Sequence, residues 1–402
     1  MIVAAAADSP VAGALVDLFV VLLAAKLGDE LFKRLGQPTI VGEILAGVVI
    51  GSSVLGLVEP TETLEVFAEL GVVFLLFWVG LETRLSELVE VGRAAILVGL
   101  LGFLLPLGGG IGLGFGLGES AATSIFLGAA LVATSVGITS AVLIELGVLD
   151  TRRARTILGA AVVDDILAMV LLAIAVGLAA EGGIDAMSIA VVVVLAIGFV
   201  GFLALGGTRL LRARPRLLSA PRFSESPLLP AVILALGLAA LASEIGLAAI
   251  IGAFLAGMMV AETKEQHPIE DEIAPLYAFF PPFFFVFIGL QVDLGAFVDA
   301  GTFALLAGVT ALAVATKFAG SWVGARSLGR ADATFVGVGM VPRGEVGIIV
   351  AGIGRTTGVI DDELFAVIVG MSILTTLAVP PVLRSLRPSA PEPKPQPQPG
   401  QS

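Results

Sequence analysis

The stretch GAAVVDDILAMVLLAIAVGL, residues 159–178, is apolar enough to cross a membrane, yet it carries Asp164 and Asp165 side by side. A transmembrane helix needs about 20 predominantly apolar residues. A charged side chain at the centre of a bilayer costs roughly 2.5–3.5 kcal/mol on insertion scales. The pair is therefore a candidate functional site, with a packing defect or an uncharged, protonated pair as the alternative.

The whole chain has the composition of a polytopic membrane protein. Of its 402 residues, 57% are hydrophobic and 14% are charged, whereas about a quarter are charged in soluble proteins. The chain has no cysteine, which excludes disulfides and thiolate metal sites. Its single histidine, His267, argues against a histidine-based metal centre, and the net charge of −12 without a basic patch argues against binding of nucleic acid.

Continuous apolar runs predict an all-α polytopic membrane protein with about thirteen transmembrane helices. The predicted spans are 10–28, 38–57, 64–81, 94–116, 121–146, 155–180, 186–207, 227–243, 245–261, 273–291, 301–326, 333–354 and 363–386. Glu43, Glu69 and Glu244 fall near span ends and receive no role. Small residues at four-residue spacing, such as Gly47 and Gly51, predict close helix packing, either within the chain or at a dimer contact.

Basic residues predict the orientation, because cytoplasmic loops of membrane proteins are rich in Lys and Arg. With the N-terminus outside and the C-terminus in the cytoplasm, only Arg355 of the 22 basic residues falls in an outside loop, while Lys317 and Arg343 fall inside spans. An even number of spans would break this sorting. We therefore expect a multi-pass protein of the cell membrane with an external N-terminus.

Lys317 lies well inside the span 301–326, after a long apolar run. A lysine that reaches water by snorkelling lies near a helix end. We therefore expect Lys317 to have a counter-charge within the membrane, and Asp164 or Asp165 is the natural partner. Snorkelling toward the cytoplasmic end, near Arg326, is the alternative.

Two other spans are interrupted by polar and helix-breaking residues. One contains LVATSVGITSAVL, residues 131–143, and the other contains GMVPRGEVGIIVAG, residues 339–352. Irregular backbone is tolerated at this depth only where it is buried in protein or lines a cavity. Pro342 suits the first turn of the second half-helix, which would place Glu345 at its positive end and let Arg343 pair with Glu345 or a neighbour. Serine and threonine that bond back to their own helix could explain the first interruption alone.

The interrupted spans are the middle members of two three-helix groups, 94–180 and 301–386. Because each group has an odd number of helices, the two copies would run in opposite directions. Interrupted helices in matching positions of two halves are typical of inverted-repeat transporters with a site at the crossing. Two carboxylates and one amine suit a small cation better than a large anion.

These motifs resemble the cation/proton antiporter superfamily, in its electrogenic two-aspartate branch. The resemblance runs from Leu18 to Leu386 and rests on KRLGQPTIVGEILAGVVIG, FAELGVVFLLFWVGLET, LVATSVGIT, ILGAAVVDDIL and PRGEVGIIVA, in this order. It implies the NhaA/NapA-like antiporter fold of about thirteen helices with inverted repeats and two broken crossing helices. It also implies a homodimer in membrane lipid that has no cofactor and exchanges Na⁺ or Li⁺ for H⁺.

The same resemblance assigns roles to individual residues. Asp165 matches the main ion-binding carboxylate, and Asp164 matches its partner, which pairs with Lys317. Both aspartates are candidate Na⁺ ligands. The supporting residues of the two broken helices are Thr134, Ser135, Arg343 and Glu345.

The resemblance also divides the chain into a dimerisation domain and a mobile core. Residues 1–93 and 227–300 are the two parts of the dimerisation domain, and residues 94–180 and 301–387 are the two core repeats. Residues 181–226 are a linker helix with a cytoplasmic loop. The proline-rich end, residues 388–402, is predicted to be a disordered tail.

The chemistry of the site predicts how exchange would occur. Na⁺ and H⁺ compete for one aspartate, and rocking of the core exposes the site to either side. If Lys317 also releases a proton when Na⁺ arrives, two protons move per sodium and exchange is electrogenic; the three groups would titrate as a coupled set. The alternatives are K⁺/H⁺ exchange by the same site, a gated cation channel, an organic-anion symporter, and a membrane scaffold or receptor, which would leave the three charges unexplained.

Overall fold

The computed structural model describes most of the chain between its two ends. The described residues are 10–386, apart from 84, 180–190, 192–193, 196–197, 208, 211–227, 246, 262–268 and 293. Every regular element among them is helical. The tail 388–402 and most of the predicted linker 181–226 lie outside this part of the chain.

Long apolar stretches without internal turn signals account for the helices. The α-helices are α2 (Pro10–Arg34), α3 (Thr39–Ile50), α4 (Glu62–Leu81), α5 (Leu85–Leu117), α6 (Ala121–Val132), α7 (Val136–Glu145), α8 (Arg152–Ala179), α11 (Leu228–Glu244), α12 (Ala249–Ala261), α13 (Glu270–Phe279), α14 (Pro281–Leu290), α15 (Ala300–Gly324), α16 (Arg330–Gly339), α17 (Glu345–Thr356) and α18 (Asp362–Ser385). The short elements η1 (Phe202–Gly207), η3 (Leu294–Phe297) and η4 (Arg326–Leu328) complete the set.

Seven helical segments of the described residues are long and apolar enough to cross a membrane. One of them joins α6 and α7, and another joins α13 and α14. The shorter apolar helices α3, α11, α12 and most of α17 fall on further predicted spans. The predicted span 186–207 is described only in part, at residues 191, 194–195 and 198–207. The multi-pass helical fold is therefore confirmed, whereas the number thirteen stays a prediction.

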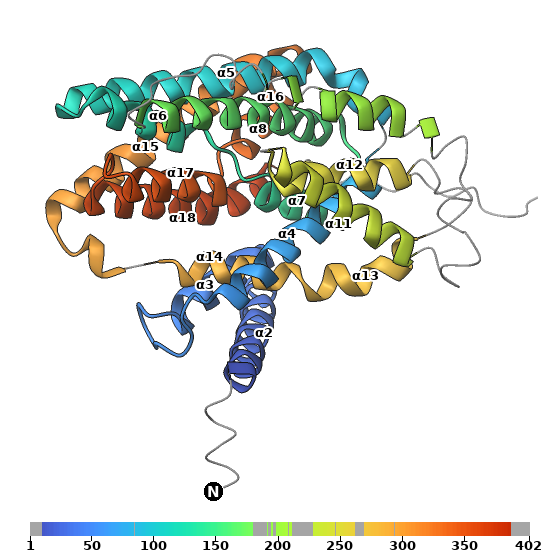
Figure 1. Cartoon of the computed structure of the whole chain (residues 1–402), viewed down its shortest axis with the longest axis horizontal. Helices are drawn as coiled ribbons and strands as arrows, with labels where there is room; N and C mark the ends of the chain where they lie inside the picture. Colours follow the sequence, from blue (N-terminus) through green and yellow to red (C-terminus); the bar gives the residue numbers. More distant parts are fainter. Residues whose placement is uncertain are drawn as a thin grey trace, which may run out of the picture.

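The helices form two bundles that contact each other (Figure 1). In the first, here the α4 bundle, α3 packs against α2 and α14, and α4 packs against α12, α13 and α14, with α11 against α12. In the second, here the α8 bundle, α5 packs against α6, α8 and α15, and α18 packs against α15 and α17. Helix α7 lies between α6 and α8 in the sequence and packs against α8 and α18, so we count it with the α8 bundle. It also contacts α4 across the boundary between the bundles.

Glycines let helices of the α4 bundle approach closely. A Cβ atom on Gly47 of α3 would meet the backbone of α14 at Val286, and one on Gly289 would meet the backbone of α3. In the same way Gly80 of α4 and Gly257 of α12 face each other. Small residues permit this kind of helix contact in membranes. The small-residue motif at Gly47 therefore packs within the chain.

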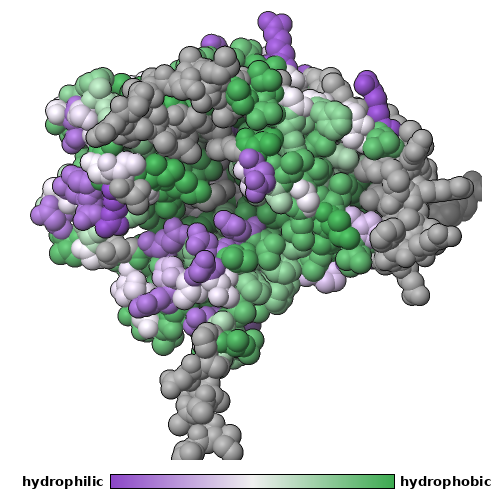
Figure 2. Space-filling view, in the orientation of Figure 1, coloured by the Kyte–Doolittle hydropathy of each residue, from purple (hydrophilic) through white to green (hydrophobic). Residues whose placement is uncertain are grey.

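The surface agrees with a chain that lies in lipid. Figure 2 shows hydrophobic side chains over the centre of the visible face and hydrophilic ones gathered toward its left end. On α2, the large apolar side chains Leu15, Phe19, Leu23 and Leu27 are all exposed. In a bilayer such side chains contact hydrocarbon rather than water, so an apolar exterior carries no penalty.

Candidate functional site

The site is built where two broken helices meet. The break between α6 and α7 contains residues 133–135, and the break between α16 and α17 contains residues 340–344. The amide of Ser135 donates to the carbonyl of Pro342 (2.9 Å), so one break satisfies a backbone group of the other. The hydroxyl of Thr139 donates to the carbonyl of Gly339 at 2.7 Å. A Cβ atom on Gly344 would lie 2.5 Å from Cβ and Oγ of Ser135, so the contact requires glycine there.

The second break differs in one detail from the sequence prediction. Pro342 was expected in the first turn of the second half-helix, but α17 begins only at Glu345, after its N-cap Gly344. Pro342 lies in the non-helical segment, where its missing N–H costs nothing and its carbonyl accepts from Ser135. Glu345 does open α17, at the positive end of the helix. The side chain of Glu345 lies outside the described part.

Lys317 of α15 reaches the end of α6 and one carboxylate of α8. Its Nζ atom donates to both oxygens of Asp164 at 2.9 Å and to the carbonyl of Val132 at 2.7 Å. Lys317 and Asp164 are both fully buried. An ammonium has three donors, so this set uses all of them. Snorkelling of Lys317 toward Arg326 is therefore wrong, because the amine is held inside the protein by an ion pair.

The acceptor Val132 is the last residue of α6. The final carbonyls of a helix have no partner within the helix and carry partial negative charge. Lys317 therefore neutralises two negative groups at once, the Asp164 carboxylate and the end of α6. This requirement explains why an amine persists at this depth.

Arg343 has the equivalent position at the second break. Its fully buried guanidinium donates to the carbonyls of Met340 (3.3 Å) and Val341 (2.9 Å), just after the last residue of α16, and to the carbonyl of Ala313 on α15 (3.3 Å). The sequence predicted that Arg343 pairs with Glu345 or with a neighbour. Within the described residues, the hydrogen-bond partners of its side chain are these neighbouring backbone carbonyls. Each broken helix thus has a buried cation at the C-terminal end of its first half.

The backbone of Arg343 is held by α18. Its amide donates to Oγ1 of Thr375 at 3.1 Å, and its carbonyl accepts from Oγ1 of Thr376 at 2.7 Å. Sequence reasoning did not single out these threonines. Two adjacent buried hydroxyls in an otherwise apolar span were the available signal.

Asp165 points to a different environment from Asp164, as expected for neighbours about 100° apart around a helix. It is 5% exposed and lines a small pocket with Leu76 of α4, Val136 of α7 and Phe254 of α12. The space open to the centre of a water molecule in this pocket is about 10 Å³, which corresponds to about one water. The pocket lies between the two bundles.

A larger vestibule adjoins this pocket on one side. Ile250 lines both cavities. The vestibule lies between α4, α11, α12 and α17, and the volume accessible to water within it is about 490 Å³. It is lined by Glu69 and Ser243 together with apolar residues. Its α4 residues precede Leu76 in the chain, so the vestibule opens toward the face of the protein at which α4 begins, here the vestibule face.

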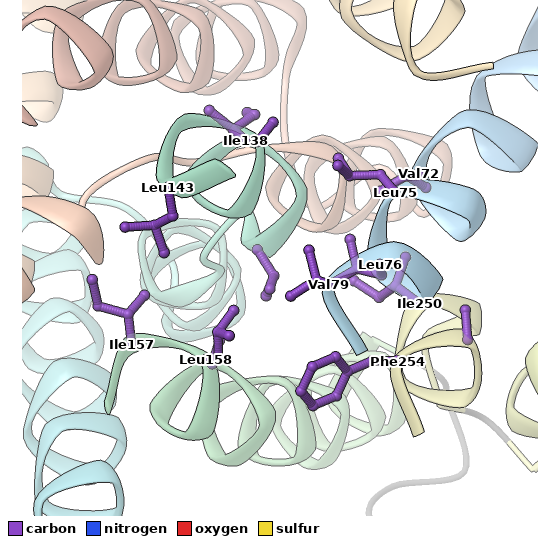
Figure 3. Close-up of a cluster of buried hydrophobic side chains, with 14 of the residues drawn as sticks. Val72, Leu75, Leu76, Val79, Ile138, Leu143, Ile157, Leu158, Ile250 and Phe254 are labelled. Carbon is purple, nitrogen blue, oxygen red and sulfur yellow. The ribbon is translucent and has the colours of Figure 1, made fainter. Parts of the chain in front are cut away.

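Toward the opposite face, apolar side chains close the boundary between the bundles. Figure 3 shows Leu76 and Val79 of α4, Phe254 of α12, Leu143 of α7 and Leu158 of α8 within one cluster of apolar side chains at the boundary between the bundles. All five are buried. The structure therefore gives Asp165 an approach from the vestibule face and mostly apolar surroundings within its pocket.

The predicted site residues are thus brought together in part. The structure places Asp164 against Lys317, interlocks the breaks through Ser135, and sets Asp165 apart in its own pocket. Thr134 is buried, and its hydroxyl has no hydrogen-bond partner within the described residues.

Comparison with known proteins agrees with this architecture. The solved structure of the sodium proton antiporter MjNhaP1 from Methanocaldococcus jannaschii at pH 8 has a similar fold, with a TM-score of 0.65 and 20% identity. The match covers 91% of this chain and 95% of that one. At this identity the likeness concerns the fold.

Sequence relatives cover nearly the full length. The Na⁺/H⁺-K⁺ antiporter GerN of Bacillus cereus is 39% identical over 371 residues, 92% of this chain and 95% of the relative. The high-affinity Na⁺/H⁺ antiporter NhaS3 of Synechocystis is 35% identical over 93% of this chain and 90% of its own length. The family described as sodium/hydrogen exchanger, transmembrane, matches residues 19–385. This chain therefore belongs to the sodium/hydrogen exchanger family of transmembrane proteins.

Proposed function

We propose that the chain is a secondary active antiporter that exchanges Na⁺ or Li⁺ for H⁺, with Asp165 as the carboxylate for which the ions compete. One observation carries the proposal: Asp165 lines a water-sized pocket beside a fully buried ion pair at the crossing of two broken helices. Such a crossing is where inverted-repeat transporters hold their ions. The names of the relatives support the same exchange.

In this mechanism the Lys317–Asp164 pair supplies the coupling. Na⁺ needs oxygen ligands, and Asp164 can supply one only if its carboxylate leaves Lys317. Lys317 would then lose its counter-charge inside the membrane and release a proton. Together with the proton displaced from Asp165, two protons would move per Na⁺, and the exchange would be electrogenic. Thr134 and Ser135 would add neutral oxygens from the first break.

Alternating access would arise from movement between the bundles. The α4 bundle would act as the fixed dimerisation domain and the α8 bundle as the mobile core, with the described conformation open on the vestibule face. With the N-terminus outside, as the basic residues favour, this is the outer face of the cell membrane. The protein would act as a homodimer.

K⁺ is the second candidate cation. The name of the Bacillus cereus relative includes K⁺. The Asp165 pocket has room for about one water molecule, and this size alone does not distinguish Na⁺ from K⁺. A K⁺/H⁺ exchanger would use the same carboxylates, so the ions have to be compared directly.

Proteoliposomes with an imposed pH gradient test the function. Addition of Na⁺ or Li⁺ should change the lumenal pH, and the rates with K⁺ rank the second candidate. The variant Asp165→Asn should abolish the response, because the side-chain amide of asparagine does not release or take up a proton at the pH values of such an assay. Glu119→Gln, which removes an exposed carboxylate between α5 and α6, is the matched control and should exchange normally.

The outcomes separate the rival classes. Flux that is ohmic and not coupled to H⁺ would indicate a channel, and Na⁺ uptake with an organic anion but without a pH change would indicate a symporter. Normal exchange by Asp165→Asn would refute the site. Loss of the voltage dependence in Lys317→Ala, with exchange retained, would support the second proton.

A further inference from the structure

A second cavity lies between the bundles on the face opposite the vestibule. The volume accessible to water within it is about 240 Å³. It is bounded by the end of α7, the start of α3, and parts of α2, α13 and α14. Of the residues that line it, Lys26 is basic, whereas Asp29, Glu43 and Glu145 are acidic. The excess of carboxylates favours a cation over an anion as its occupant.

Glu43 is the unusual member of this cavity. The residue is only 6% exposed and lies in α3, a helix that is otherwise apolar apart from its first threonine. Within the described residues the Glu43 side chain has neither a hydrogen bond nor a salt bridge. An ionised carboxylate that is buried without a partner is strongly disfavoured. Lys26 attracts Glu43 across the cavity, and the cavity in front of Glu43 has room for a cation that would bind the carboxylate directly.

Glu145 faces the same cavity from the α8 bundle. Its carboxylate accepts from the amide of Thr39 at 3.1 and 3.2 Å and from the Thr39 hydroxyl at 3.3 Å. Glu145 is the last residue of α7, where the helix dipole disfavours an acid, but it lies at the N-terminus of α3, where the dipole favours one. It therefore links the bundles and retains acceptor capacity, because a carboxylate has about four lone-pair sites.

A polar residue marks the route from this cavity to Asp165. Val136, Ser140 and Ile144 follow one another at four-residue spacing, so they share one face of α7. Val136 lines the Asp165 pocket, and Ile144 lines the Glu43 cavity. Between them the Ser140 hydroxyl is fully buried without a hydrogen-bond partner within the described residues. A buried hydroxyl without a partner is destabilising, and hydration in the other conformation would remove that cost.

We propose that Glu43, with Glu145 across the cavity, forms a loading site for the exchanged monovalent cation, and that the α7 face marked by Ser140 is its route to Asp165. The inference rests on the proposed antiport. A divalent ion is a poorer candidate, since no group of three or more His, Asp or Glu side chains within the described residues could hold a metal ion. A hydrated monovalent ion needs fewer charged ligands.

Sidedness of transport tests the loading site. In proteoliposomes sorted by orientation, Na⁺ is supplied on one face at a time and the KM is measured for each. Glu43→Gln should raise the KM for Na⁺ by about tenfold on the cavity face, the loss expected for one charged contact, and leave the vestibule face and the maximal rate unchanged. Glu43→Asp should restore the KM in part, and Glu119→Gln should change neither.

An unchanged KM, or equal changes on both faces, would refute the loading site while leaving the antiport intact. Failure of wild-type exchange, or normal exchange by Asp165→Asn, would instead refute the antiport.

A labelling experiment tests the route without relying on Glu43. The chain contains no cysteine, so Ser140→Cys introduces a single thiol. During turnover a small, membrane-impermeant thiol reagent should modify it when added on the cavity face and not when added on the vestibule face. Modification from the vestibule face, or from neither face, would refute the route.

Discussion

Removing the Lys317 amine should destabilise the protein more than any exposed charge change, because three contacts depend on it. Lys317→Met leaves the Asp164 carboxylate fully buried without its cation, and leaves the Val132 carbonyl without its donor. Breaking a buried ion pair by removing one partner costs about 3–5 kcal/mol. In Na⁺-free buffer we therefore expect the apparent Tm to fall by several degrees or more.

The double variant separates charge burial from packing. Asp164→Asn together with Lys317→Met removes both charges, and replacement of a buried pair by neutral groups is often nearly neutral. The double variant should therefore be more stable than Lys317→Met alone, with a coupling energy on the order of 2 kcal/mol. Lys33→Ala, an exposed lysine in the last turn of α2, is the matched control.

The assay is thermal unfolding in detergent at a fixed scan rate, followed by the fluorescence of Trp78 and Trp322. A fixed rate matters because the apparent Tm of an irreversibly unfolding protein depends on it. If Lys317→Met unfolds at the wild-type temperature, or if the two single effects simply add in the double variant, the reasoning about the buried pair is refuted.

Three further outcomes follow from the site. Asp165→Asn should lose exchange yet unfold closer to the wild-type temperature than Lys317→Met does, since Lys317 keeps its hydrogen bonds to Asp164 and Val132; a fall as large as that of Lys317→Met would contradict this. Gly344→Ala should lower stability by about 1–3 kcal/mol, because its Cβ would overlap Ser135, and an unchanged Tm would show that the breaks are not in contact. Arg343→Met should be less stable than Arg343→Lys, because the amine can still donate to the carbonyls that follow α16; equal thermal stability would argue against that capping role.

Much of the fold could be predicted because the membrane enforces simple rules. Apolar runs of bilayer length became helices, and polar or proline-containing interruptions at 131–143 and 339–352 became breaks. The expectation that Lys317 needs a partner inside the membrane was met by Asp164. Residue chemistry alone left the choice between Asp164 and Asp165 open, because the rotation of α8 about its axis is set by neighbouring helices.

The parts that sequence could not give depend on contacts between distant segments. Pro342 lies outside the half-helix because its carbonyl pairs with Ser135, more than two hundred positions away in the chain. Glu43 looks like an ordinary acid near a helix end, and the approach of α2, α7, α13 and α14 encloses it. The sequence of one transmembrane helix does not show which other helices will pack against it.

The apolar boundary shown in Figure 3 has a mechanical consequence. Aliphatic contacts have no preferred direction, so a movement of one bundle past the other can exchange one packed set of methyl neighbours for another without breaking a hydrogen bond. The Thr39–Glu145 hydrogen bonds are a polar contact between the bundles that such a movement would have to break. The apolar boundary would therefore hold each of the two arrangements by packing, while the polar contacts decide which arrangement is occupied.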